Sequence, residues 1–169
     1  MQFYVTVMSI CVIVLLLSSL VFLPGAMRLK ALRASNIGVR SGTARWNASF
    51  SSRLRASGFV DSYSRNGRDF TFAYTADSSG LGFWRGVLRP ERFGHIDWSA
   101  IRAIHLGVID NSLRPMGALC VELWESPESL SFAVTGKRSV ATLRAGSAEL
   151  KTLVSQLEQD RLAAVGEHK

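Results

Sequence analysis

The longest hydrophobic pattern is an uninterrupted apolar stretch near the N-terminus. Residues 3–23 (FYVTVMSICVIVLLLSSLVFL) contain no charged side chain and are followed by Pro24 and Gly25. As a helix with a rise of about 1.5 Å per residue, this stretch would be about 31 Å long, and about 20 apolar residues are enough to span a bilayer. The pattern predicts a single transmembrane anchor at residues 1–26.

A cleaved secretory signal is the alternative interpretation, because the stretch begins at the N-terminus. A signal peptide has a basic leading region, an apolar core of about 7 to 15 residues and a cleavage site made of small residues. Here only Met1 and Gln2 precede a longer apolar run, and Pro24 would occupy the third position before a cut after Ala26. These features favour the anchor.

From Asp69 onward the hydrophobic residues alternate with polar or small ones. Phe70, Phe72 and Tyr74 alternate in this way, which predicts a half-buried strand. A turn follows at residues 77–80, where Asp, Ser and Gly cluster. Further strands are expected at residues 81–87, at residues 96–98 and 101–108, and at residues 118–124 and 130–134, the last two joined by a hairpin turn at 126–129.

The C-terminal part favours a helix over residues 147–162. Ser147 can serve as the N-cap, and apolar residues recur with the spacing of one helix face; they are Leu150, Leu153, Val154, Leu157 and Leu162. Residues 165–169 are expected to form a disordered tail. Residues 43–68 are harder to interpret: a helix is possible because large apolar residues recur about every four positions, but Ser, Arg and Gly58 interrupt the pattern.

Charge is distributed unevenly. Residues 28–68 carry nine Lys or Arg residues and one acidic residue, Asp61, whereas residues 69–169 carry eleven basic and twelve acidic residues. The net charge of +7 therefore comes from a basic juxtamembrane segment, residues 27–45, and its continuation. Lys and Arg are retained on the cytoplasmic side of a membrane helix, so the pattern predicts a single-pass plasma-membrane protein with its N-terminus outside and a cytoplasmic C-terminal domain.

The same basic segment suggests contact with anionic lipid. The residues concerned are Arg28, Lys30, Arg33, Arg40 and Arg45. A topology signal without lipid specificity is the other interpretation. Nucleic acid is not expected as a partner, because the excess of basic over acidic residues is confined to the segment that follows the anchor. Cys11 and Cys120 are too few for a disulfide framework or a Cys-based metal motif.

The order of elements carries a resemblance to a known family. The segments TADSSGLGFWRG, HIDWSAIRAI and SAELKTLVSQLEQ follow one another with two further strands between the second and the third. In this they resemble the small bacterial pleckstrin-homology-like (GRAM-like) domains. The resemblance implies an α+β protein in which a small antiparallel β-barrel or sandwich, residues 46–164, is closed by a C-terminal amphipathic helix.

Residues with catalytic potential do not form a recognisable motif. No serine lies in Gly-x-Ser-x-Gly or Ser-x-x-Lys, and Gly80 and Gly82 lack the third glycine and the following helix of a phosphate loop. His95, Asp97 and His105 could bind a metal only if the fold brought them together. We therefore expect no enzyme activity, no cofactor and no metal.

Two tryptophans of the distal domain are candidates for a binding surface, since Trp is frequent in interface hot spots. Trp98, between Ile96 and Ile101, is expected in the core, whereas Trp84 and Arg85 are possible partner contacts. The sequence thus predicts a membrane-anchored, non-enzymatic adaptor or scaffold that binds a protein partner. The alternative is a sensor of anionic lipid head groups that uses the basic cluster, with Arg53 and Arg55 as possible additions.

Overall fold

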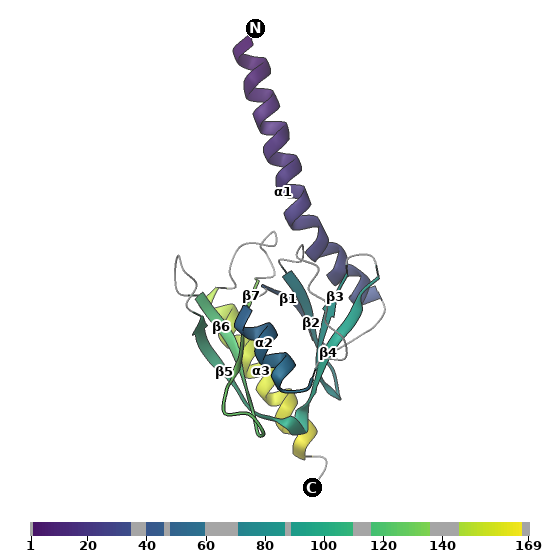
Figure 1. The fold of residues 1–169 in the computed structure, drawn as a ribbon, viewed down its shortest axis with the longest axis vertical. Coiled ribbons are helices and arrows are strands. Elements are labelled where there is room, and N and C mark those ends of the chain that lie inside the picture. Colours follow the sequence, from purple (N-terminus) through teal and green to yellow (C-terminus); the bar gives the residue numbers. More distant parts are fainter. Residues whose placement is uncertain are drawn as a thin grey trace.

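The computed structural model describes residues 2–34, 40–45, 48–59, 71–86, 89–109, 116–135 and 146–166, and within the first helix it describes the side chains of residues 4–14 and 26–34. A long N-terminal helix, α1 (Gln2–Ala34), projects from a body of strands that also contains two shorter helices (Figure 1). These are α2 (Ala48–Ala56) and α3 (Ser147–Gly166). The chain is therefore α+β, as predicted.

Seven strands form one antiparallel sheet in the order β4-β3-β2-β1-β7-β6-β5. The strands are β1 (Arg40–Arg45), β2 (Thr71–Ala76), β3 (Gly80–Arg85), β4 (Glu91–Asp97), β5 (Ile101–Ile109), β6 (Met116–Leu123) and β7 (Leu130–Val134). A short 3₁₀ turn, η1 (Trp98–Ala100), joins β4 to β5. The predicted hairpins β2–β3 and β6–β7 are confirmed by their antiparallel registers.

The sheet is open, so the predicted closed barrel is wrong. In the described part of the chain, β4 and β5 are the two edge strands and do not pair with each other. The physical reason lies at the start of β5, where the backbone N–H of Ile104 donates to Glu158 Oε2 of α3 at 3.0 Å. A side chain of α3 thus occupies a position at which a closing strand would have to bond.

The predicted transmembrane anchor, residues 1–26, is also wrong. Among the residues that the structure describes, no helix combines the length and the apolar character needed to cross a membrane. The helix that contains the apolar stretch does not end at Pro24 but continues through Arg28, Lys30 and Arg33, and its last turns lie against β1 and β2. The predicted single-pass location, the cytoplasmic placement of the domain and the membrane as an integral partner are withdrawn with the anchor.

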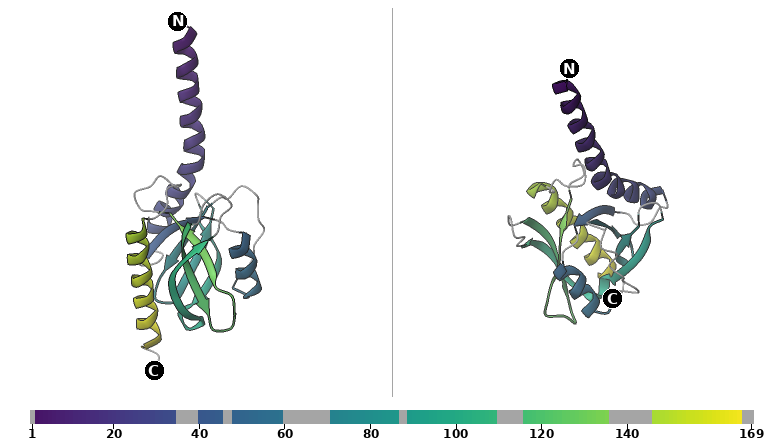
Figure 2. Two further views of the ribbon diagram at one scale, coloured as in Figure 1. Left: turned by 90° about the vertical axis from the view of Figure 1, so that its left-hand side faces the viewer. Right: turned by 45° about the horizontal axis from the view of Figure 1, so that its top comes forward.

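The hydrophobic core lies between the strands and the two shorter helices. In Figure 2 (left), α2 and α3 lie on opposite sides of the strands. Phe50 of α2 stacks on Phe72 with a ring-centroid distance of 5.0 Å and packs edge-on against Phe83 and Phe132. Leu150 and Leu157 of α3 are buried in the same core.

Residues 43–68, whose hydrophobic pattern is ambiguous, contain the end of β1 and all of α2. Phe50 and Leu54 are one turn apart and both are buried, so they form the inner face of α2. The helix ends where Gly58 adopts a φ of +73°, and Gly58 N–H donates to the carbonyl oxygen of Arg55 at 3.1 Å. Trp46 and Tyr63, which contributed to the predicted pattern, lie outside the described residues.

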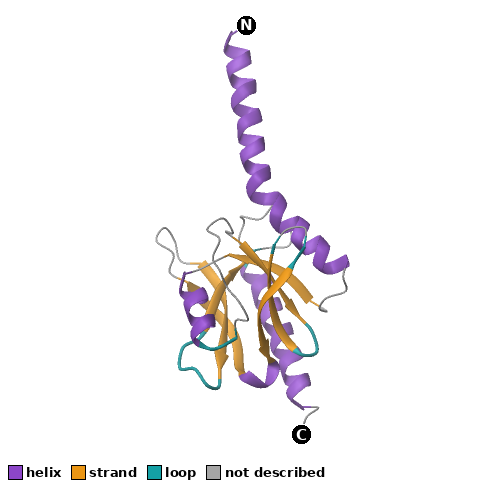
Figure 3. Cartoon of the chain, turned by 45° about the vertical axis from the view of Figure 1, so that its right-hand side comes forward, coloured by secondary structure: helices purple, strands orange, loops and turns teal. Residues whose placement is uncertain are grey.

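The C-terminal helix is longer than the sequence indicated. It begins at Ser147 as predicted but reaches Gly166, so that Ala164 and Val165 pack against the core. Figure 3 shows α3 passing behind the strands, with the C-terminus at the end of the molecule opposite the tip of α1.

Candidate functional site

The predicted basic cluster does not form one exposed surface, and Arg28 shows this best. Its side chain is only 1% exposed. Arg28 Nε donates to the carbonyl oxygen of Gly86 at 2.5 Å, and Nη1 donates to that of Thr71 at 2.7 Å. Arg28 therefore fastens the end of α1 to the sheet and lacks the exposure that contact with a lipid surface requires.

The other predicted lipid contacts lie in different surroundings. Arg40 forms an ion pair of 2.6 Å with Asp160 of α3, which raises the pKa of Arg40. Arg45 lies at the opposite end of β1, and the exposed Arg33 donates from Nε to Ser41 Oγ at 3.4 Å. Lys30 is exposed on α1. The five residues are thus divided between the base of α1 and the two ends of β1.

Trp84 and Arg85, the predicted partner contacts, are both engaged within the sheet. Trp84 Nε1 donates to Thr75 Oγ1 at 2.8 Å, and a Cβ at Gly82 would lie only 3.1 Å from the same nitrogen. Arg85 Nη2 forms an ion pair of 2.9 Å with Glu91. The contact of these two residues with a partner stays a prediction.

His95 lies in a polar cluster on β4, but the geometry is not that of a catalytic triad. Ser79 Oγ and Asp97 Oδ1 both approach the same ring nitrogen, His95 Nε2, at 3.4 and 3.2 Å. In a triad the nucleophile and the carboxylate bond to opposite ring nitrogens. His105 lies on β5 at the other edge of the sheet, with its Nδ1 3.7 Å from Glu122, so the fold does not bring His95 and His105 together.

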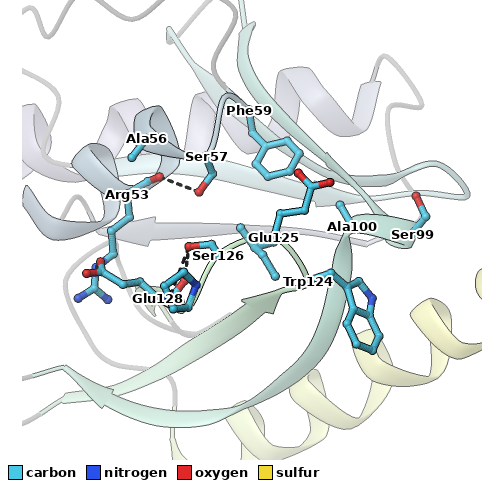
Figure 4. Close-up of a pocket in the computed structure, with 12 residues that line it drawn as sticks. Arg53, Ala56, Ser57, Phe59, Ser99, Ala100, Trp124, Glu125, Ser126 and Glu128 are labelled. Atoms are coloured by element: carbon cyan, nitrogen blue, oxygen red, sulfur yellow. Dashed lines mark hydrogen bonds and ion pairs between the residues drawn. The ribbon is translucent and has the colours of Figure 1, made fainter.

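A cleft of about 640 Å³ opens between the C-terminal end of α2, the turn η1 and the β6–β7 turn (Figure 4). We call it the Trp124 cleft. Its lining mixes apolar residues with charged and hydroxyl side chains from these three elements; the residues are Arg53, Ala56, Ser57, Phe59, Ser99, Ala100, Leu123, Trp124, Glu125, Ser126, Pro127 and Glu128.

Trp124 is the most unusual residue of this cleft, because its side chain is 65% exposed. Trp124 follows Leu123, the last residue of β6, which is buried. Successive side chains of an extended chain point to opposite faces, so the alternation that buries Leu123 turns Trp124 outward. Its backbone N–H donates to the carbonyl oxygen of Ala100 at 3.1 Å, which fixes this end of β6 to η1.

The charged residues of the cleft are held by specific bonds. Arg53 Nη1 donates to the carbonyl oxygen of Ser129 at 2.8 Å, and Arg53 Nε lies 2.8 Å from Glu128 Oε2. In Figure 4 the carboxylate of Glu125 points toward the side of the cleft where Phe59 lies. Within the described part of the chain Glu125 forms no ion pair, so its carboxylate has no described cation as a partner.

The sequence patterns did not point to Trp124. They indicated Trp84 as a possible partner contact and predicted Trp98 in the core, and Trp98 is indeed buried and donates from Nε1 to the carbonyl oxygen of Asp77 at 2.8 Å. The signal that could have revealed Trp124 is the pair Leu123-Trp124 at the end of a strand that is followed by a Ser-Pro turn. Two adjacent large apolar residues on an extended segment point to opposite faces, so one of the two can be left exposed.

Comparison of the chain with protein-family models, curated proteins and solved structures gave no match. The resemblance to pleckstrin-homology-like (GRAM-like) domains therefore stays a prediction from the sequence. The assignment of a function depends on the geometry of the molecule alone.

Proposed function

We propose that the chain is a non-enzymatic adaptor that binds a partner protein in the Trp124 cleft. The observation that carries this proposal is the 65% exposure of Trp124 in the wall of a cleft of about 640 Å³. An indole that is exposed to this extent lacks the stabilising free energy of about 25 cal/mol for each Å² of apolar surface removed from water. Tryptophans in such positions are frequent among the few residues that dominate binding energy at protein interfaces.

The cleft has the mixed character of an interface. Phe59, Ala100 and Leu123 provide apolar surface next to Trp124, and the serines and charged residues provide polar groups around it. Protein interfaces commonly combine an apolar centre with a polar rim. This combination suits a protruding side chain of another protein.

Charge complementarity defines the partner more closely. Glu125 and Glu128 contribute two carboxylates to the cleft, and Arg53, the one cation among the described lining residues, is committed to Glu128 and to the carbonyl oxygen of Ser129. A complementary segment would place an apolar side chain against Trp124 and a Lys or Arg near Glu125. An arginine could in addition stack on the indole face.

A binding role also agrees with how the polar groups of the cleft are used. The Ser57 hydroxyl donates to the carbonyl oxygen of Arg53 at 2.9 Å, and the Ser126 hydroxyl donates to that of Glu128 at 3.3 Å. Both hydroxyls thus stabilise the walls of the cleft. The alternative of a lipid-head-group sensor has less support, because Arg28 is buried and Arg40 is paired with Asp160.

Site-specific photo-crosslinking in cells tests the proposal. Trp124 is replaced by the photoreactive residue p-benzoylphenylalanine in the full chain, and the exposed Ser155 of α3 is replaced in a matched control. We expect a defined covalent adduct with one protein from position 124 that position 155 does not give. The same adduct pattern from both positions, or none from position 124, would contradict a binding site at this cleft.

Once the crosslinked protein is identified and purified, the affinity can be measured by isothermal titration calorimetry. Truncation of a hot-spot tryptophan typically costs more than about 2 kcal/mol, so Trp124→Ala should weaken binding by about thirtyfold or more. Glu125→Lys should weaken binding because it reverses the charge offered to the partner. Leu162→Ala, at an apolar residue of α3 that is 56% exposed, is the matched control and should leave the affinity unchanged.

A further inference from the structure

The free edge of β5 offers a second binding surface, which does not depend on the proposed function of the Trp124 cleft. Among the described strands, β5 pairs with β6 along one side only, and its other side is an edge of the sheet. Exposed edges normally carry features that prevent another strand from pairing with them, such as lysines, prolines or bulges. Whether β5 can pair with another strand depends on which of its main-chain groups point outward.

The bond between Ile104 and Glu158 shows which main-chain groups of β5 point outward. Because the N–H of Ile104 donates to a side chain of α3 at 3.0 Å, it points away from β6. In an antiparallel ladder the residues alternate between those that bond to the neighbouring strand and those whose N–H and C=O point away from it. Leu106 and Val108 follow Ile104 at this spacing, so their N–H and C=O groups also point to the free edge.

The helix α3 protects only the first part of this edge. Arg161 donates from Nη2 to Glu158 Oε1 at 2.6 Å and from Nη1 to the carbonyl oxygen of Ile101 at 3.4 Å, so the pair Glu158 and Arg161 covers the edge from Ile101 to Ile104. Hydrogen bonding to Glu158 raises the pKa of Arg161, in keeping with a tightly held pair. The register irregularity of β5, between Ile101 and Ala103, lies in the same protected part.

The second part of the edge has none of these features. Residues 105–109 read His-Leu-Gly-Val-Ile and contain no proline, lysine or carboxylate. The side chains of Leu106 and Val108 are 41% and 68% exposed. Among the described residues, no bond outside the regular ladders reaches the main chain of Leu106 or Val108. This part of β5 is therefore an exposed apolar edge with outward donors and acceptors.

We propose that residues 105–109 of β5 bind an extended polypeptide segment, which adds to the sheet as a further strand. The occupant follows from the chemistry of the edge, because donors and acceptors that alternate along a straight line are matched by another extended backbone. The exposed Leu106 and Val108 favour apolar side chains at alternate positions of the segment. The Glu158 and Arg161 pair ends the site, since the Ile104 N–H is already bonded.

The location of Leu150 supports an apolar partner for the inner side of this edge. Val108 pairs with Gly117 of β6, and a Cβ on Gly117 would lie 3.2 Å from Leu150 Cδ2 of α3. Directly opposite residues of an antiparallel pair point to the same face, so Val108 lies on the face where α3 packs. An added strand would extend this apolar face beyond the area that α3 covers.

The test uses the full chain and a display library of random linear peptides as the probe. Peptides selected on the wild-type chain should share apolar residues at alternate positions. Val108→Pro removes one outward N–H and is sterically allowed at a strand edge, so it should weaken binding at least tenfold. Val108→Ala keeps the N–H and is the matched control, and Trp124→Ala should have no effect on these peptides.

Amide hydrogen exchange followed by NMR shows the mode of binding directly. In the free chain the outward amides of Leu106 and Val108 should exchange much faster than the inward amides of His105 and Gly107. A selected peptide should slow exchange at Leu106 and Val108 but change little at Ile104, which Glu158 already bonds.

Three outcomes would overturn the inference. The first is that no peptide is enriched over background. The second is that the enriched peptides bind Val108→Pro as well as wild type, or lose binding in Trp124→Ala. The third is concentration-dependent dimerisation of the chain that Val108→Pro abolishes in analytical ultracentrifugation, which would make a second copy of the chain the occupant of this edge.

Discussion

Arg28 and Gly86 lie 58 positions apart in the sequence, yet Arg28 Nε donates to the carbonyl oxygen of Gly86 at 2.5 Å. Gly86 adopts a φ of +78°, a conformation that other residues rarely adopt, and a Cβ there would lie 2.6 Å from the carbonyl oxygen of Arg89. Gly86 thus permits the backbone shape that presents its carbonyl oxygen to the guanidinium. A glycine after β3 and an arginine near the end of α1 together determine how α1 meets the sheet.

We predict that Arg28→Leu lowers the free energy of unfolding by about 2 to 4 kcal/mol, because it leaves the half-buried carbonyl oxygens of Gly86 and Thr71 without their charged donor. Lys30→Ala removes an exposed cation from the same helix and should change stability by less than about 0.5 kcal/mol. Urea denaturation of the full chain measures both. Equal effects of the two substitutions would show that Arg28 is not a structural residue.

A second prediction concerns the aromatic core. Phe50 is fully buried and contacts the rings of Phe72, Phe83 and Phe132, so it joins α2 to three strands. Phe50→Ala should lower the free energy of unfolding by about 3 to 5 kcal/mol, as large-to-small core substitutions do. Ser52→Ala, on the exposed side of α2, is the control and should be close to wild type in the same denaturation experiment.

A third prediction concerns acid stability. Burial alone would raise the pKa of Asp77, but bonds from the Ser79 hydroxyl and from the backbone N–H groups of Ser79 and Gly80, with the nearby His95, outweigh it and lower this pKa. The stabilisation is present above the unfolded-state pKa of about 3.9 and is lost as the pH falls through the lower folded-state pKa.

The variant Asp77→Asn should therefore show a smaller loss of stability between about pH 5 and pH 2 than wild type does. Ser79→Ala removes one of the three donors and should give an intermediate slope. The measurement is the urea concentration at the midpoint of unfolding, determined for wild type and both variants across this pH range. A slope in Asp77→Asn as steep as that of wild type would assign the acid sensitivity to other carboxylates.

Much of the sheet could be predicted because the alternation of apolar and polar residues along a strand reflects the burial of one strand face. Phe72 and Phe83 mark β2 and β3, and both lie in the core. The central strand β1 escaped recognition because it lacks this signal. In β1, Gly42 pairs with Tyr74, and the tyrosine ring occupies the space that a side chain at Gly42 would need. The apolar group that covers this part of β1 comes from its neighbour, so the sequence of β1 does not show it.

The errors in the prediction arise from relations between distant segments. The expected barrel depended on how β4 and β5 meet, and the bond from Ile104 to Glu158, 54 positions further along the chain, changes that relation. The predicted lipid contact does not fit Arg28, which turns into the body of the protein. The cleft beside Trp124 depends on the position of η1 next to the end of β6, a contact between distant segments that no local pattern contains.

The burial of Tyr74 leads to the last prediction, which concerns alkaline stability. Tyr74 is 3% exposed beneath β1, and burial, with a further contribution from the negative charge of Glu149, raises the pKa of its phenol well above the usual value of about 10. The unfolded chain therefore loses this proton at a lower pH than the folded chain does. Stability is unaffected below about pH 10 and falls as the pH rises above it.

Replacing Tyr74 with phenylalanine keeps the ring that packs over Gly42 and removes the ionisable group. We expect Tyr74→Phe to unfold at a urea concentration close to that of wild type at pH 7 but to lose less stability between about pH 10 and pH 12. Tyr4→Phe, on the exposed part of α1, controls for the removal of a phenol elsewhere. Only a group whose pKa differs between the folded and unfolded chains can make the free energy of unfolding depend on pH. If wild type and Tyr74→Phe lose stability in parallel above pH 10, the phenol of Tyr74 is therefore not the group that destabilises the fold in alkali.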